Sequence, residues 1–218
     1  MNIKIIKTKD GSQSLYLPDL NETYHSVFGA ITESEHVYIE AGYKSLTKQK
    51  INILEIGFGT GLNVFLTCLA AKNNDKKIYY ETLEKHPLPQ DIILKLNNFE
   101  KEIHQILFER IHQAPWQKAV NITPQITLHK NQTDLLYYKT NKLFDLIYFD
   151  AFAPDKQPEL WTAEIFEKMY RFLDTDGILV TYSAKGQVRR NMLAAGFKVV
   201  RLPGPPGKRE MLRAVKKT

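Results

Sequence analysis

Hydrophobic positions along the chain change their spacing near residue 51. Before this point, Ile3–Lys7 and Ser14–Leu17 flank Asp10-Gly11, a dipeptide that favours a tight turn, so the first residues predict a β-hairpin. After this point, short apolar runs alternate with segments whose apolar residues recur every three or four positions. This alternation predicts strands and helices in turn.

Seven apolar runs are predicted as strands, at residues 51–56, 78–83, 125–129, 144–149, 178–182, 197–202 and 210–215. Helices are predicted near residues 62–69, over 88–112 with a stripe of Ile92, Leu96, Phe99, Ile103 and Ile106, and at 165–173 and 185–195, with a loop between Pro115 and Pro124. Such a chain folds as an α/β protein with a mostly parallel seven-stranded sheet and helices on both faces. We expect residues 1–50 to form a small extension with the β-hairpin, packed on a core of residues 51–218.

Ligands of such sheets bind beyond the carboxyl ends of the strands. The first loop there contains three glycines at alternate positions after a strand. A dinucleotide loop would place its third glycine where Leu62 stands. The observed spacing is typical of S-adenosyl-L-methionine sites, where glycines allow close approach and a carboxylate favours the cationic cofactor. The predicted contacts are Glu55, Gly57, Phe58, Gly59, Thr60, Gly61 and Asn63; the alternative is an ordinary strand-to-helix turn.

Polar side chains also follow the next two strands. Glu84, with Lys85 beside it, ends the second strand, where a carboxylate can accept hydrogen bonds from both ribose hydroxyls. Asn131 and Asp134 follow the third strand. Either is a candidate for the adenine edge, and either could instead cap a helix.

Asp150 emerges at the end of the fourth predicted strand, followed by Phe152 and Pro154. An alkylamine is mostly protonated near neutral pH and must lose a proton before it attacks a methyl group. A carboxylate can bind the ammonium, orient it and accept the proton, and an aromatic ring can face the cation. We predict Asp150, Phe152 and Pro154 as catalytic residues, with Asp150 also beside the cofactor. In the alternative, Asp150 caps a turn and Phe152 belongs to the core.

Composition narrows the class of protein. The chain is 43% hydrophobic and 25% charged, as globular domains are, and no secretory signal or membrane span is recognised. The single cysteine, Cys68, excludes an intrachain disulfide and a cysteine-rich zinc site. We therefore expect a cytoplasmic protein that needs no metal.

The net charge of +6 is concentrated in residues 185–218, which hold ten basic residues and one acidic residue. This segment carries +9 and leaves −3 for residues 1–184. A basic segment on a mildly acidic body indicates either a polyanionic partner or a solvated charged face.

Three motifs in order resemble one family: Leu54–Asn63, Phe149–Pro154 with Gln157–Thr162, and Lys208–Leu212. Residues 32–40 resemble its N-terminal signature, and the likeness runs from about residue 20 to 215. The family is the methyltransferase domain of the bifunctional tRNA 5-methylaminomethyl-2-thiouridine biosynthesis protein, with its stand-alone versions.

The resemblance implies a class I (Rossmann-like) methyltransferase that transfers a methyl group from S-adenosyl-L-methionine to the 5-aminomethyl group of wobble uridine in tRNA. Three glycines would then line the cofactor, Glu84 its ribose, and Asp150 the amine. The bifunctional protein also carries an FAD-dependent oxidase domain, for which 218 residues leave no room. We expect a monomer that works with a separate oxidase or with other enzymes that form the aminomethyl group.

Two departures from the family pattern concern the loops. Lys130-Asn131 stands where the family usually has Gly-Asp, and Gly204-Pro205-Pro206-Gly207 where it has Gly-Phe-Gly. The first leaves the adenine contact open, and the second predicts a stiffer loop.

The resemblance implies that the basic segment, residues 185–218, binds tRNA. We expect it to bind phosphates of the anticodon stem-loop through Lys185, Arg189, Arg190, Lys208 and Arg209. Phe58, Phe152 and Trp161 are candidate stacking platforms for the uridine, or else core residues. Two other functions stay open: methylation of a small-molecule or protein amine, and RNA binding without catalysis.

Overall fold

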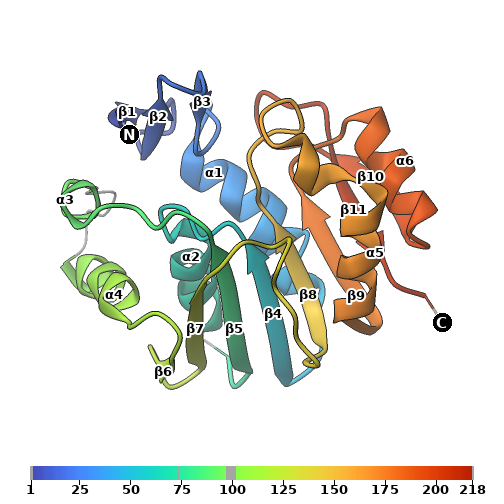
Figure 1. Ribbon diagram of the computed structural model, residues 1–218. Coiled ribbons are helices and arrows are strands. Elements are labelled where there is room, and N and C mark those ends of the chain that lie inside the picture. Colours follow the sequence, from blue (N-terminus) through green and yellow to red (C-terminus); the bar gives the residue numbers. More distant parts are fainter. Residues whose placement is uncertain (1, 73, 97–101, 218) are drawn as a thin grey trace.

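The computed structural model describes residues 2–72, 74–96 and 102–217 (Figure 1). Its main sheet has eight strands in the order β10-β11-β9-β8-β4-β5-β7-β6. They are β4 (Lys50–Ile56), β5 (Lys77–Glu84), β6 (Ala119–Asn121), β7 (Ile126–Gln132), β8 (Phe144–Phe149), β9 (Leu173–Thr181), β10 (Lys198–Pro203) and β11 (Glu210–Val215). The central strands β7, β5, β4, β8 and β9 run parallel, and β6, β10 and β11 pair antiparallel.

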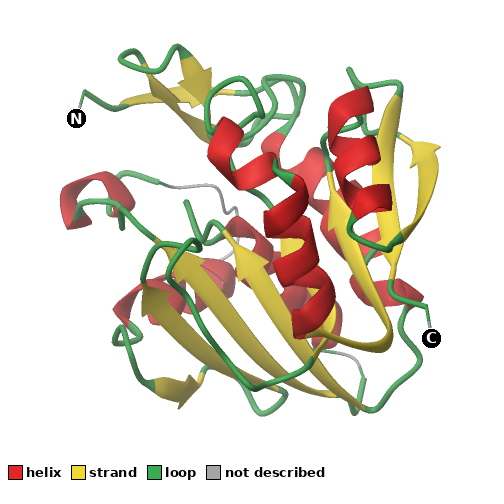
Figure 2. Ribbon diagram, turned by 45° about the vertical axis from the view of Figure 1, so that its right-hand side comes forward, coloured by secondary structure: helices red, strands yellow, loops and turns green. Residues whose placement is uncertain are grey.

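Helices cover both faces of this sheet (Figure 2). They are α1 (Ala30–Ser34), α2 (Leu62–Ala71), α3 (Gln90–Ile93), α4 (Glu102–Gln113), α5 (Ala163–Phe172) and α6 (Gly186–Ala194). Neighbouring residues of β4 point to opposite faces, since Ile53 belongs to the core beneath α2 and α4, and Leu54 to the core beneath α5 and α6. The predicted class of fold is confirmed. Among the described residues, every helix is too short or too polar to cross a bilayer.

The N-terminal residues form a second, antiparallel sheet of β1 (Lys4–Lys7), β2 (Gln13–Leu17) and β3 (Glu22–Thr23). The predicted hairpin is present, with Gly11 at a φ of 85° in its turn. From this sheet the chain runs through α1, a π-helical segment Glu35–Glu40 and a 3₁₀ turn Tyr43–Ser45 into β4. Leu15, Val37 and Tyr38 are buried in the same core as Ile53. The extension lies beyond the carboxyl ends of the central strands (Figure 1).

Three expectations about local structure need correction. The helix predicted over 88–112 is divided, because α3 ends at Ile93 and α4 begins at Glu102; Phe99 lies outside the described residues. Ile103 and Ile106 are 58% and 52% exposed, so the predicted stripe is not the buried face of α4. The predicted loop before Pro124 contains β6, a short edge strand that pairs with β7. The main sheet therefore has eight strands, where seven were predicted.

Candidate active site

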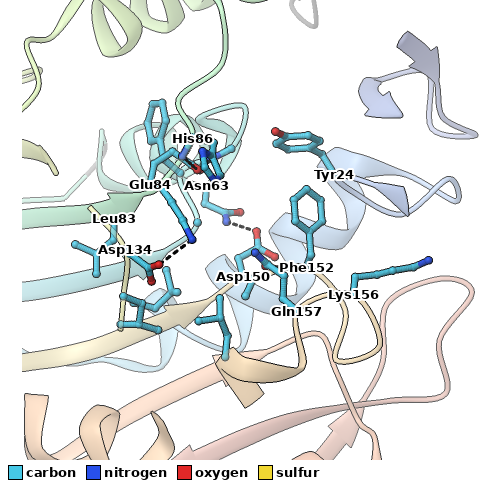
Figure 3. Close-up of a pocket in the computed structure, with 18 of the residues that line it drawn as sticks. Tyr24, Asn63, Leu83, Glu84, His86, Asp134, Asp150, Phe152, Lys156 and Gln157 are labelled. Atoms are coloured by element: carbon cyan, nitrogen blue, oxygen red, sulfur yellow. Dashed lines mark hydrogen bonds and ion pairs between the residues drawn. The ribbon is translucent and has the colours of Figure 1, made fainter. Parts of the chain in front are cut away.

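A cavity of about 380 Å³ opens at the carboxyl ends of β4, β5, β7 and β8 (Figure 3). Loops after four strands form its floor and walls, and the N-terminal extension covers it. Its lining includes Tyr24, His25, Gly57, Phe58, Gly59, Asn63, Glu84, Lys85, Asp134, Asp150, Phe152 and Glu159. Most of the predicted cofactor and catalytic residues thus meet in one place.

The glycine loop is held tightly between β5 and β8. The amides of Gly57 and Phe58 both donate to the carbonyl of Leu83, at 3.0 and 3.2 Å. Gly57 has a φ of 92°, and a Cβ there would lie 2.6 Å from the backbone oxygen of Asp150. Only glycine satisfies both conditions. The cofactor loop and the candidate catalytic residue are therefore in direct contact.

Glu84 and Asp134 border the cavity as carboxylates with fixed orientation. Glu84 accepts hydrogen bonds from the amides of Gly59 (3.0 Å) and His86 (2.8 Å). Asp134 pairs with Lys85 at 2.9 Å and accepts from the amide of Leu136 at 2.9 Å. Asp134 therefore both caps a turn and lines the cavity.

Asp150 accepts hydrogen bonds on both carboxylate oxygens. The Tyr38 hydroxyl donates to one at 2.6 Å. The Asn63 amide donates to the other at 2.8 Å (Figure 3). Burial raises the pKa of Asp150 to about 6, although both hydrogen bonds oppose the rise. Near neutral pH the group is a carboxylate that an ammonium would stabilise.

The extension contributes aromatic residues that sequence reasoning did not identify as part of the site. The Tyr24 ring lies edge-on to Phe152, with centroids 5.1 Å apart (Figure 3). Tyr24 and His25 line the cavity, whereas Tyr38 reaches Asp150 from the π-helical segment. Of these residues only Tyr38 lies within a sequence motif described above, the resemblance of residues 32–40.

Glu55 is not among the residues that line the cavity. It is fully buried, and it faces Asn63, Tyr80 and Thr82 without hydrogen-bond geometry among the described residues. Burial raises its pKa from 4.5 to about 8. Near pH 7 the side chain is therefore largely an uncharged acid behind the glycine loop, in contrast to the expected carboxylate beside the cofactor.

Replacing Glu55 by glutamine is expected to stabilise the protein increasingly as the pH rises. The carboxyl pKa is about 8 in the folded protein and about 4.5 in the unfolded chain, so the folded state binds the proton more tightly. This preference stabilises the wild type fully below about pH 4.5 and is lost as the pH rises to about 8. Glutamine does not ionise, so the variant's free energy of unfolding should gain on wild type by up to about 1.4 kcal/mol per pH unit in that window. Urea unfolding at several pH values measures the difference, and a difference independent of pH would contradict an uncharged Glu55.

Several predicted site residues lie away from the cavity lining. Asn131 is buried and donates to Glu81 at 2.7 Å, so of the two candidates for adenine only Asp134 lines the cavity. Lys130, the other residue of the pair that departs from the family pattern, donates to the carbonyls of Ile111 and His112. These carbonyls belong to the last turn of α4, where they have no partner within the helix. Thr60, Gly61 and Pro154 also lie outside the lining.

The predicted RNA-binding residues differ in their exposure and in whether they are paired with a carboxylate. Lys208 pairs with Glu33, and its Nζ lies 4.0 Å from the centroid of the Tyr182 ring. Lys185 pairs with Asp155. Exposed Arg190 donates to Gln187 at 2.8 Å, Arg189 is partly buried, and Arg209 is exposed.

The aromatic ring of Trp161 belongs to the core. It is 3% exposed, packs against Phe149 and Phe166, and donates from its indole nitrogen to the Phe152 carbonyl at 2.8 Å. The core alternative therefore describes Trp161, and its contact with Phe152 supports the loop after β8.

The cavity fits a cationic ligand better than a pyrophosphate. Among its described lining residues are four carboxylates, Glu84, Asp134, Asp150 and Glu159, and two lysines, of which Lys85 is paired. The Asn63 amide, beside the glycine loop, directs its Nδ2 to Asp150 at 2.8 Å. These features suit the sulfonium and ammonium groups of the expected cofactor.

Comparisons with known proteins agree with this geometry. A family model described as S-adenosyl-L-methionine-dependent methyltransferase matches residues 97–217. The chain is 31% identical to a tRNA 5-methylaminomethyl-2-thiouridine biosynthesis bifunctional protein of Campylobacter hominis, over 92% of the chain and 31% of that protein. A protein of the same name from Cupriavidus metallidurans is 27% identical, over 94% and 33%. The chain spans about a third of the length of these relatives.

Solved structures show the same fold. MnmC2 from Aquifex aeolicus superimposes with a TM-score of 0.81 at 29% identity, over 100% of this chain and 71% of that one. Spermidine synthase from Thermotoga maritima gives a TM-score of 0.61 at 16% identity, over 99% and 69%. The second likeness concerns the fold alone.

Proposed function

Because the chain belongs to the S-adenosyl-L-methionine-dependent methyltransferase family, we propose that it methylates the 5-aminomethyl group of wobble uridine in tRNA. The observation that carries this proposal is Asp150, which lies in contact with the glycine loop and has both oxygens oriented by neighbouring donors. The names of the two bifunctional relatives supply the substrate, and the likeness to MnmC2 covers the whole chain.

Different residues of the cavity would bind the cofactor, the substrate amine and the proton during such a methyl transfer. The bound cofactor would supply an electrophilic methyl group, held by the glycine loop, Glu84 and Asp134. The carboxylate of Asp150 would bind the substrate ammonium, orient the nitrogen and accept its proton. Phe152 and Tyr24 would border the entering amine, and their ring faces favour a cation.

The two parts of the chain would serve this reaction together. Residues 51–218 act as the methyltransferase domain, and residues 1–50 act as an extension that supplies Tyr24 and Tyr38 to the site. Among the basic residues, exposed Arg190 and Arg209 are the stronger candidates for RNA phosphates, because Lys185 and Lys208 are paired with carboxylates.

Purified protein is expected to convert 5-aminomethyluridine to 5-methylaminomethyluridine in tRNA when supplied with S-adenosyl-L-methionine. Nucleoside mass spectrometry measures the product, with tRNA that lacks the aminomethyl group as the control. Methylation of both tRNAs, or of free alkylamines at comparable kcat/KM, would instead support a general amine methyltransferase. Cofactor binding by calorimetry without any methylated product would support an RNA-binding module.

A further inference from the structure

Lys130 places a buried cation at the carboxyl end of α4, outside the lining of the cavity. The residue is 1% exposed, and its ammonium donates to the carbonyls of Ile111 and His112 at 3.1 and 2.8 Å. The carbonyls at the end of a helix carry partial negative charge and stabilise a cation there. Burial lowers the pKa of Lys130 to about 8, so the side chain is still largely an ammonium at pH 7.

Two aromatic rings lie against the same ammonium. The Nζ of Lys130 lies 4.8 Å from the centroid of the Trp116 ring and 5.3 Å from the centroid of the Phe58 ring. The two rings meet edge-on, with centroids 5.7 Å apart. The segment after Trp116 is also tied to β7, because the Gln117 amide donates to the Lys130 carbonyl at 2.7 Å. Phe58 lines the cavity, so a single residue separates the buried cation from the cofactor site.

His112 connects the end of α4 to the glycine loop. Burial, and to a smaller extent the Lys130 ammonium, lowers its pKa to about 4, so the ring is neutral near pH 7. Its Nε2–H donates to the Thr60 carbonyl at 3.0 Å. A Cβ at Gly61 would lie 3.0 Å from the Phe58 ring and 3.1 Å from the His112 Nε2, so both rings pack directly on the loop. Thr60 and Gly61 therefore belong to the support of the loop, although they lie outside the cavity lining.

These contacts run without a break from the buried cation to the cofactor loop. The ammonium binds the last carbonyls of α4, the same turn of α4 carries His112, and His112 holds the loop through its hydrogen bond to Thr60. The loop is held on its other side by the hydrogen bonds of Gly57 and Phe58 to the Leu83 carbonyl. A loop that is fixed before its ligand arrives binds that ligand without the entropy cost of being ordered.

We propose that Lys130 is a positioning residue for the cofactor, which acts through the end of α4 and His112 to hold the glycine loop in the shape that binds S-adenosyl-L-methionine. Removal of the ammonium leaves two carbonyls of α4 unpaired in the protein interior and frees His112 to turn away from Thr60. The inference concerns the cofactor that the family has in common, and it is independent of which amine is methylated.

Lys130→Met keeps most of the length of the side chain and removes its ammonium. We expect the Kd for S-adenosyl-L-methionine to rise about tenfold, which corresponds to the loss of about one hydrogen bond. Lys76→Met is the matched control, because the Lys76 ammonium donates to the Leu46 carbonyl at 2.6 Å and lies 5.1 Å from the centroid of the Tyr43 ring. Lys76 precedes β5, at the end of the sheet opposite the cavity, so its cofactor Kd should equal that of wild type. Calorimetry measures Kd, and thermal unfolding measures Tm.

His112→Phe tests the same path without altering Lys130. It keeps a ring against Phe58 and removes the hydrogen bond to Thr60, and we expect it to raise the cofactor Kd about tenfold as well. Because both residues act through one hydrogen bond, the double variant should also bind about tenfold more weakly than wild type, whereas independent effects would multiply to about 100-fold.

Three results would overturn the proposal. The first is a cofactor Kd of Lys130→Met equal to wild type, even with a lower Tm, because a merely structural role lowers Tm alone. The second is a cofactor Kd of His112→Phe equal to wild type, a measurement that does not depend on the folding of Lys130→Met. The third is a 100-fold effect in the double variant, which would show that Lys130 does not act through His112.

Discussion

Replacement of Asp150 by alanine should lower kcat for methyl transfer by about 10²–10⁴-fold, the range that a positioned acid or base contributes. The carboxylate is the only group that receives hydrogen bonds from both Tyr38 and Asn63 among the described contacts of the cavity. Without it, the substrate ammonium loses its anchor and proton acceptor. The Kd for S-adenosyl-L-methionine should change no more than a few-fold, as measured by calorimetry beside single-turnover kinetics.

The pH dependence provides an independent check on Asp150. Because burial raises its pKa to about 6, activity of the wild type should fall as the pH drops through about 6, where the carboxylate becomes protonated. Asp155→Ala is the matched control, since that side chain is 74% exposed and pairs with Lys185. Near-normal turnover by Asp150→Ala would refute the assignment, and so would an equal loss in the control.

Replacement of Gly57 by alanine is expected to weaken cofactor binding at least 100-fold and to destabilise the fold. The new Cβ would lie 2.6 Å from the Asp150 carbonyl at a φ that alanine rarely adopts, and a strained backbone of this kind costs about 1–3 kcal/mol. Relief of the clash must move the end of β8, which carries Asp150. Calorimetric Kd and thermal unfolding measure the two effects.

Gly186→Ala is the control for this change. A Cβ at Gly186 would meet only an Arg190 nitrogen at 3.4 Å, and the residue begins α6. We expect its Tm and cofactor Kd to match wild type within error. If Gly57→Ala bound the cofactor as tightly as Gly186→Ala, the close approach of the loop to β8 would not matter for binding.

Local pattern was sufficient for most of the fold. The buried run at β8 and the glycine loop after β4 are evident in the sequence, because burial on both faces demands continuous apolar residues. The region of residues 88–112 was less predictable. Its polar and apolar residues follow a helical period, but α4 buries Phe108 and Ile111 and leaves Ile103 exposed. The periodicity of apolar residues predicts that a helix has an apolar face, but it does not predict which part of the fold packs on that face.

The candidate site divides in the same way. Asp150, Glu84 and the three glycines follow from strand ends and spacing, because parallel strands bring their carboxyl ends to one edge. Tyr24 and Tyr38 do not. Tyr24 lines the cavity and Tyr38 contacts Asp150, both from an extension whose position over the sheet depends on contacts far apart in the chain. The pairing of Lys208 with Glu33 likewise joins two motifs that the sequence places 175 residues apart.

The sequence by itself determined the order of strands and helices, the glycine loop and the candidate residues at the strand ends, because these depend on local period and chain direction. The tertiary structure alone decided which groups carry charge and which meet. It buries Glu55 and thereby keeps it largely uncharged, and it leaves Asp150 in contact with the cavity as a carboxylate. Desolvation depends on the whole surroundings of a group, and no local pattern of residues specifies them.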